Sequence, residues 1–218
     1  MTQNRPFALD MGNPLIRVMV KPRDRQDVYN LWQYDAELGQ IMRAVRDPTL
    51  RAMRYIWWRD QIDGLADGIE AAHPVLEGLK QIFSPNDLRR LACLADIWAD
   101  FSEYVPLGLP EVIDFSTKRG HLLFATSAQL MGSGGQQAHA SGGQIWALGD
   151  VASQLSDAEL SRSIWAHIRA EEKNAEETSL PYALRALTAL SRKRAESAGK
   201  ICPLSEQMLL FRMGMKGG

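Results

Sequence analysis

Apolar residues recur at helical spacing along most of the chain, beginning near residue 27. In the first run they are three, four or seven positions apart, which places them on one face of a helix. This run consists of Val28, Leu31, Trp32, Leu38, Met42 and Val45. Asp47-Pro48 follows. Because proline suits the first turn of a helix, this pair predicts the end of one helix and the start of the next.

The helical pattern continues toward the C-terminal end. A second helix is expected over residues 49–69, with apolar side chains on two sides, which is typical of a helix buried on more than one face. Ser84-Pro85 and Pro110 predict two further starts, and helices are also expected from residue 145, from Ser156 and from Pro181. Small residues in the 110–132 helix favour close packing against a neighbouring helix. They are Ser116, Gly120, Ala125, Ser127 and Ala128.

No segment shows sustained alternation of apolar and polar residues, a hairpin signal or a βαβ rhythm. The sequence therefore predicts an all-α fold, a single-domain helical bundle of about seven to nine helices around one core. Residues 1–25, which contain three prolines, are expected to form an irregular N-terminal segment, and residues 26–218 the helical domain. A flexible Gly-rich loop is expected at residues 132–143. It does not have the pattern of a phosphate-binding loop, because no strand precedes it and no lysine follows its glycines.

Composition and charge narrow the class of protein. Of the 218 residues, 45% are hydrophobic and 23% charged, as in an ordinary globular domain, and the net charge is −1. This balance argues against a general nucleic-acid binder, whose domain is strongly basic. Two cysteines form neither a disulfide framework nor a zinc motif, and the longest mainly apolar stretch, residues 122–131, is too short to cross a bilayer. We therefore expect a cytoplasmic protein with no nucleic-acid partner, able to associate with a membrane surface.

Two pairs of aspartates stand four residues apart, Asp63/Asp67 and Asp96/Asp100. Residues at this spacing share a helix face, and two carboxylates there can hold Mg²⁺, which in turn bridges a diphosphate. Isoprenoid diphosphate chemistry needs two such pairs facing each other across a cavity, whereas pairs on solvated helix faces are the commoner alternative. Asp96 and Asp100 lie off the apolar stripe of their helix, so we expect them to face solvent or a cleft.

Asp35 differs from these aspartates because it falls between Leu31 and Leu38 on the apolar face of its helix. Its side chain is therefore predicted to point inward. A buried carboxylate needs a partner, and Arg54 is the partner that we predict.

Several segments together resemble a known family. They are residues 28–39 (VYNLWQYDAELG), residues 45–48 (VRDP), and the RxxWWRD pattern of residues 54–60. These are similar to the opening of the squalene/phytoene synthase family, above all to its shorter, atypical bacterial branch, which is also similar to a mitochondrial complex I assembly factor. Residues 94–101, 120–132 and 144–150 resemble later helices of that family. The resemblance implies a helical bundle of the isoprenoid synthase type.

The chain departs from this family at both metal motifs. The resemblance places the first motif near Asp35, but Gly39 stands four residues later. It places the second near Asp150, where the partner position is Gln154, and Asp150 is expected to project outward. The Arg-Arg-Gly-x-x-Tyr-Leu-Pro segment that helps active members to bind the diphosphate is missing. The family's activity therefore does not follow from its fold.

Three hypotheses follow. In the first, the chain is a pseudoenzyme with no metal cofactor that binds an isoprenoid or lipid, or a protein partner, in the former cavity. The residues proposed to line that cavity are Asp35, Arg54, Trp57, Trp58, Asp96 and Asp100. In the second, it is a Mg²⁺-dependent prenyl transferase for head-to-head condensation that uses Asp35, Asp96 and Asp100 as metal ligands.

The third hypothesis is an assembly factor that works with a protein partner at a membrane surface. The chain after residue 190 carries six basic residues and two acidic ones, close to a run of large apolar side chains. Such a tail can lie on anionic lipid. The alternative is a basic end that packs on the domain. The basic residues are Arg192, Lys193, Arg194, Lys200, Arg212 and Lys216.

Overall fold

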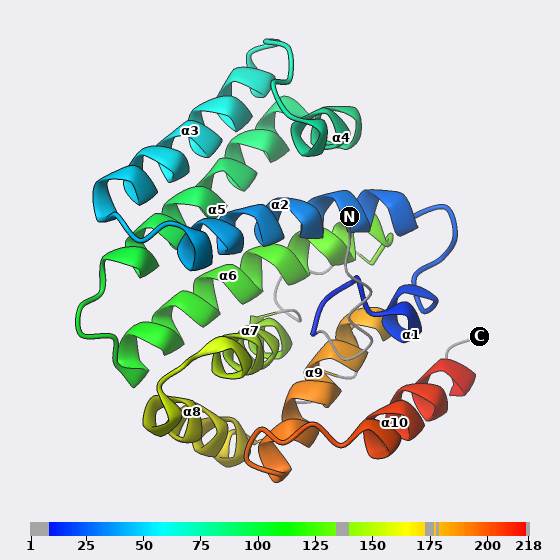
Figure 1. Cartoon of the computed structure of the whole chain (residues 1–218). Coiled ribbons are helices and arrows are strands. Elements are labelled where there is room, and N and C mark those ends of the chain that lie inside the picture. The colour runs from blue at the N-terminus through cyan, green and yellow to red at the C-terminus, as the bar shows by residue number, and fades with distance from the viewer. Residues whose placement is uncertain (1–8, 134–139, 173–176, 178, 217–218) are drawn as a thin grey trace. The chain divides into compact units, whose positions relative to one another are not determined.

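The computed structural model describes residues 9–133, 140–172, 177 and 179–216. These residues form ten α-helices and no strand, which confirms the predicted all-α class (Figure 1). No helix in this part of the chain is both long and apolar enough to span a bilayer. The helices are α1 (Pro14–Arg17), α2 (Arg25–Ala44), α3 (Pro48–Ala66), α4 (Pro74–Ile82), α5 (Pro85–Glu103), α6 (Leu109–Leu130), α7 (Ala140–Gln154), α8 (Ala158–Ala170), α9 (Tyr182–Glu196) and α10 (Pro203–Lys216).

Packing divides the chain into two compact units. One unit comprises Gln26–Leu107, and the other joins Met1–Arg25 to Gly108–Gly218. The first boundary coincides with the predicted start of the helical domain. The division of the chain into residues 1–25 and 26–218 as domains stays a prediction.

The Gln26–Leu107 unit contains α2 to α5, and α3 and α5 pack along one another (Figure 1). Local capping explains where two of these helices begin. The Asp47 side chain accepts a hydrogen bond from the backbone N–H of Leu50, 2.8 Å away, at the start of α3. Ser84 caps α5 in the same way through the N–H of Asp87. Both starts agree with the Asp-Pro and Ser-Pro signals of the sequence.

A close approach of two backbones joins α6 to α7 in the other unit. A Cβ atom built on Gly120 would lie 2.2 Å from the carbonyl oxygen of Gly143, so only glycine allows this contact. The close packing expected from the small residues of the 110–132 helix is therefore present. The expected loop at 132–143 is wrong at its end, because residues 140–143 form the first turn of α7. Residues 134–139 lie outside the described part.

A short helix, α1, lies in the N-terminal segment that was expected to be irregular. The Asn13 side chain accepts a hydrogen bond from the N–H of Leu15, and Pro14 occupies the first helical position. The proline at this place therefore starts a turn of helix instead of breaking one.

A buried ion pair attaches α10 to α9. The guanidinium of Arg194 donates to both carboxylate oxygens of Glu206 over 3.0 and 2.9 Å, and both residues are at most 3% exposed. Arg192 is paired with Glu177, and Lys193 with Glu196. Three of the six basic residues counted in the tail are thus matched by acids. Since Glu196 and Glu206 were already counted there, only the pair with Glu177 reduces the basic character of this end further.

Candidate functional site

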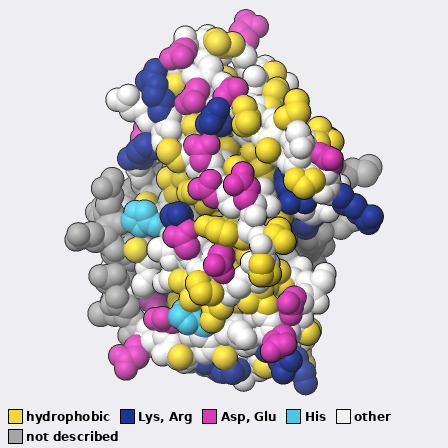
Figure 2. Space-filling model, turned by 90° about the vertical axis from the view of Figure 1, so that its left-hand side faces the viewer, with side chains coloured by type: hydrophobic (Ala, Val, Ile, Leu, Met, Phe, Trp, Pro, Cys, Tyr) yellow, Lys and Arg dark blue, Asp and Glu magenta, His cyan; other side chains and the backbone are white. Residues whose placement is uncertain are grey.

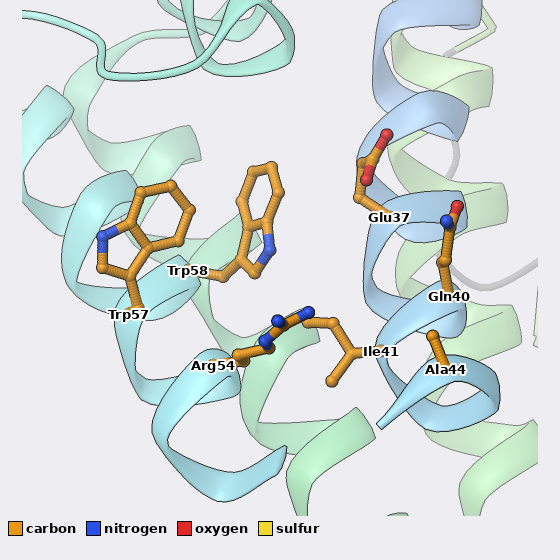
Figure 3. A pocket seen from close by; sticks show the side chains of 7 residues that line it. All are labelled: Glu37, Gln40, Ile41, Ala44, Arg54, Trp57 and Trp58. Carbon is orange, nitrogen blue, oxygen red and sulfur yellow. The ribbon is translucent and has the colours of Figure 1, made fainter. Parts of the chain in front are cut away.

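A pocket with a volume of about 340 Å³ lies between α2 and α3 (Figure 3). Helix α2 contributes residues one turn apart on one face, and α3 contributes one cation and two indoles. All of the lining residues belong to the Gln26–Leu107 unit. They are Glu37, Gln40, Ile41, Ala44, Arg54, Trp57 and Trp58.

The two tryptophans of the RxxWWRD pattern have different roles in this pocket. Trp58 is buried, and its ring lies against Tyr34 and His73, with centroids 5.6 and 5.0 Å away. Trp57 is 42% exposed and meets Trp58 edge to face. An indole with this much apolar surface in water has an unused contact face, whereas Trp58 is held by its neighbours. Trp57 is therefore the aromatic side chain available to a ligand.

Arg54 lines the pocket and is exposed. Within the described ranges it makes no hydrogen bond or ion pair, so its charge is available. The predicted pairing of Arg54 with Asp35 is wrong. Asp35 is buried as expected, but the indole N–H of Trp98 on α5 donates to its carboxylate over 2.9 Å. The inward face of α2 turns Asp35 toward α5, whereas Arg54 lies on the pocket side of α3.

Two polar residues of the pocket, Glu37 and Gln40, were missed by the candidate set. The helical pattern alone could have found them, because Glu37, Gln40, Ile41 and Ala44 are spaced by three, one and three positions along α2. The sequence did not show which helix packs opposite this face of α2.

Asp96 and Asp100 are both exposed on α5, which agrees with their predicted position off the apolar stripe. Arg59 on α3 lies 3.6 Å from the Asp96 carboxylate and 3.1 Å from Asp60. Partial burial raises the pKa of Asp96 despite the nearby Arg59, and the charge of Asp100 raises it further. Asp67 of the other aspartate pair is bonded to Arg89 over 2.7 Å. These carboxylates thus lie among arginines on the paired helices α3 and α5.

Acidic side chains are interspersed with other kinds on the face of the molecule shown in Figure 2. Lys, Arg and exposed hydrophobic side chains lie between the Asp and Glu side chains there, so the acidic groups of this face do not form one separate patch.

Asp150, in the other unit, does not point outward as predicted. Its carboxylate accepts hydrogen bonds from Arg119 and from Gln154, over 2.8 and 2.7 Å. The Arg119 guanidinium is itself buried and lies over the Trp146 ring at 4.6 Å. Because Trp146 and Arg119 are both buried, this side of α7 is an interior one.

These carboxylates do not form the three-membered metal site of the alternative hypothesis. Mg²⁺ takes nearly octahedral oxygen coordination, in which carboxylates are joined by water or substrate phosphates. Among the described residues, no three or more His, Cys, Asp or Glu side chains form a group that could hold a metal ion. Asp35, Asp96 and Asp100, the alternative ligand set, are therefore not brought together, since Asp35 is buried against Trp98 and the other two are exposed.

The hydroxyl of Tyr34 gives a testable property of the helices around the pocket. It is buried and has no hydrogen-bond partner in the part of the chain that the structure describes. Burial, with Asp96 and Asp35 nearby, raises the pKa of Tyr34 well above its usual value. Replacing Tyr34 with Phe should therefore raise the free energy of unfolding by about 1 kcal/mol at neutral pH, measured by urea denaturation.

The raised pKa of Tyr34 also fixes the direction of a pH effect. Above about pH 10 the hydroxyl loses its proton in the unfolded chain but keeps it in the folded one, so the free energy of unfolding falls as the pH rises. Tyr34→Phe should remove the part of this decrease that comes from Tyr34. Tyr55→Phe is the matched control for stability at neutral pH only, because burial raises the pKa of Tyr55 as well and both variants share the pH effect. The Tyr55 hydroxyl donates to the Leu38 carbonyl over 3.3 Å, so this change should cost about 1 kcal/mol. A Tyr34→Phe protein less stable than the wild type would contradict the assignment of an unbonded hydroxyl.

Comparison with known proteins gives one match. Residues 12–98 match the family model described as squalene/phytoene synthase, which confirms the family resemblance found in the sequence. The matched segment contains every residue that lines the pocket between α2 and α3. No curated protein and no solved structure matched the chain.

Proposed function

From the premise that residues 12–98 are those of a squalene/phytoene synthase relative, we propose that the chain is a pseudoenzyme that binds an isoprenoid or similar lipid. In this proposal it does not carry out the metal-dependent head-to-head condensation of isoprenyl diphosphates. The ligand site is the pocket between α2 and α3.

One observation supports the loss of that chemistry above all. The carboxylates nearest to the two expected metal motifs are already bonded inside the protein, Asp35 to Trp98 and Asp150 to Arg119. Expelling a diphosphate from an apolar site requires cations that neutralise the developing charge. A metal would have to compete with these contacts, because Asp35 is 4% exposed beside Trp98 and both carboxylate oxygens of Asp150 already accept hydrogen bonds.

The pocket supports the choice of ligand class. Arg54 supplies a cation for an anionic head group, and the exposed face of Trp57 supplies apolar contact for a hydrocarbon chain. Glu37 and Gln40 stand on the opposite wall (Figure 3) and favour a head group that also carries a proton or a hydroxyl. Polar and apolar groups share the wall of this pocket about equally, which suits a ligand that has both an ionic head group and an apolar part.

Farnesyl diphosphate tests both parts of this proposal. We expect saturable binding, which the change in tryptophan fluorescence measures. We expect no release of pyrophosphate when Mg²⁺ is added. Arg54→Gln should weaken binding about tenfold, because it removes a charged hydrogen bond. Trp57→Ala should weaken it by a similar factor. Arg46→Gln removes another exposed arginine, which lies outside the pocket, and should leave the affinity unchanged.

Two results would count against this proposal. Release of pyrophosphate that is abolished by Asp35→Asn would identify an active transferase that uses Asp35 with Asp96 and Asp100. An affinity unchanged by Arg54→Gln and Trp57→Ala would remove the pocket as the ligand site.

A further inference from the structure

Helix α10 presents large apolar side chains to solvent along one stripe. Leu204, Met208, Phe211 and Met215 are spaced by four, three and four positions, and each is 65–78% exposed. At ~100° per residue they fall within about 60° of helix circumference. The opposite side of α10 carries Glu206 and Leu210, which are buried and attach the helix to its own unit. The outward stripe is therefore left mostly in contact with water.

The apolar stripe continues onto the neighbouring helix α1. The two helices belong to the same unit and pack together (Figure 1). Leu15 of α1 and Val18, the residue that follows α1, are exposed there. A mainly apolar groove with a volume of about 410 Å³ runs between them, with Val18 on one side and Phe211 on the other. We call this region the α1/α10 surface. It consists of Leu15, Val18, Leu204, Met208, Phe211 and Met215.

Positive charge borders the α1/α10 surface. Lys21 lines the groove, and Arg212 lies beside the stripe on α10, next in sequence to Phe211. Within the described ranges neither cation has an acidic partner. Glu206, the acidic residue of α10, is turned inward and paired with Arg194. Asp24, three residues after Lys21, is paired with Arg23. A surface with an apolar centre and a basic border is complementary to a layer of anionic head groups above hydrocarbon.

We propose that the α1/α10 surface docks on an anionic lipid bilayer, with the α10 stripe entering the interface and Lys21 and Arg212 at the level of the phosphates. Helix α10 lies along the bilayer plane and does not cross it. A second copy of the chain is the less favourable occupant. In a two-fold dimer this surface would meet itself and bring the basic borders of both copies toward one another.

Vesicle flotation tests this proposal. The wild-type chain should float with vesicles of phosphatidylcholine mixed with phosphatidylglycerol and stay unbound with phosphatidylcholine alone. The double change Met208→Asp and Phe211→Asp should lower the partition coefficient at least tenfold, because two apolar anchors become charged. Met53→Asp is the matched control. Met53 is 61% exposed on α3, outside the surface, and this variant should float as the wild type does.

The basic border gives a second, independent readout. Lys21→Gln with Arg212→Gln should weaken flotation severalfold and make it less sensitive to added salt, because charge attraction to the bilayer is screened. Far-UV circular dichroism should be unchanged in every variant, since the altered side chains are exposed. Equal binding to both kinds of vesicle would overturn the proposal. So would flotation unaffected by the two aspartates, or a dimer in solution that Phe211→Asp dissociates.

Discussion

Glu206→Ala should lower the free energy of unfolding by about 3–5 kcal/mol, because it removes the carboxylate that neutralises a buried cation. Arg194 makes two hydrogen bonds to this carboxylate, and neither residue has appreciable contact with water. Since most domains are stable by about 5–15 kcal/mol, the loss is a large fraction of the total. Urea denaturation followed by far-UV circular dichroism measures it.

Two further variants test whether the loss of stability comes from leaving a charge buried, and not from losing an ion pair as such. Lys193→Ala removes an exposed ion pair with Glu196 on the same helix and should change stability by no more than about 0.5 kcal/mol. Arg194→Met combined with Glu206→Leu should recover most of the loss, because two apolar side chains of similar size need no partner. Equal effects of Glu206→Ala and Lys193→Ala would show that α10 is not held at α9 through a buried pair.

The starts of α3 and α5 could be predicted because they depend on neighbours in the chain. Asp47 and Ser84 each cap a helix that begins at the next residue, a proline. Such signals act over two or three residues, so the sequence contains all that they need. The missed helix α1 uses the same device, with Asn13 before Pro14. It is too short for an apolar period to appear.

The partners of buried charges could not be predicted in the same way. Periodicity correctly placed Asp35 on the inner face of α2, but its donor, Trp98, is 63 residues further along the chain. Asp150 and Arg119 are 31 residues apart on two helices. A helical pattern gives the direction of a side chain relative to its own axis, whereas its partner depends on which helix packs against that face.

The pocket between α2 and α3 could be predicted in part. Arg54, Trp57 and Trp58 were selected through the family resemblance, and all three line it. Asp96 and Asp100 share the unit but lie outside the pocket. Residues of one short pattern on one helix stay together when the fold forms, whereas residues gathered from different helices by chemical type need not meet.

Gly120→Ala should destabilise the chain by about 3 kcal/mol, near the upper end of what overpacking costs. The added Cβ would meet the carbonyl carbon and oxygen of Gly143, 2.3 and 2.2 Å away. These are backbone atoms of α7, so no side-chain rotation relieves the overlap and the two helices must move apart. The gain in helix propensity from Ala, about 1 kcal/mol, offsets part of this cost.

Gly214→Ala is the matched control, since Gly214 is also helical but meets only the end of the Met19 side chain, 3.8 Å away. This change should raise stability by about 0.5–1 kcal/mol, because Ala restricts the unfolded chain and fits the helix. If Gly120→Ala lowers the free energy of unfolding and Gly214→Ala raises it, the loss comes from the contact between α6 and α7. If Gly120→Ala were as benign as Gly214→Ala, these two helices would lie farther apart than the structure places them.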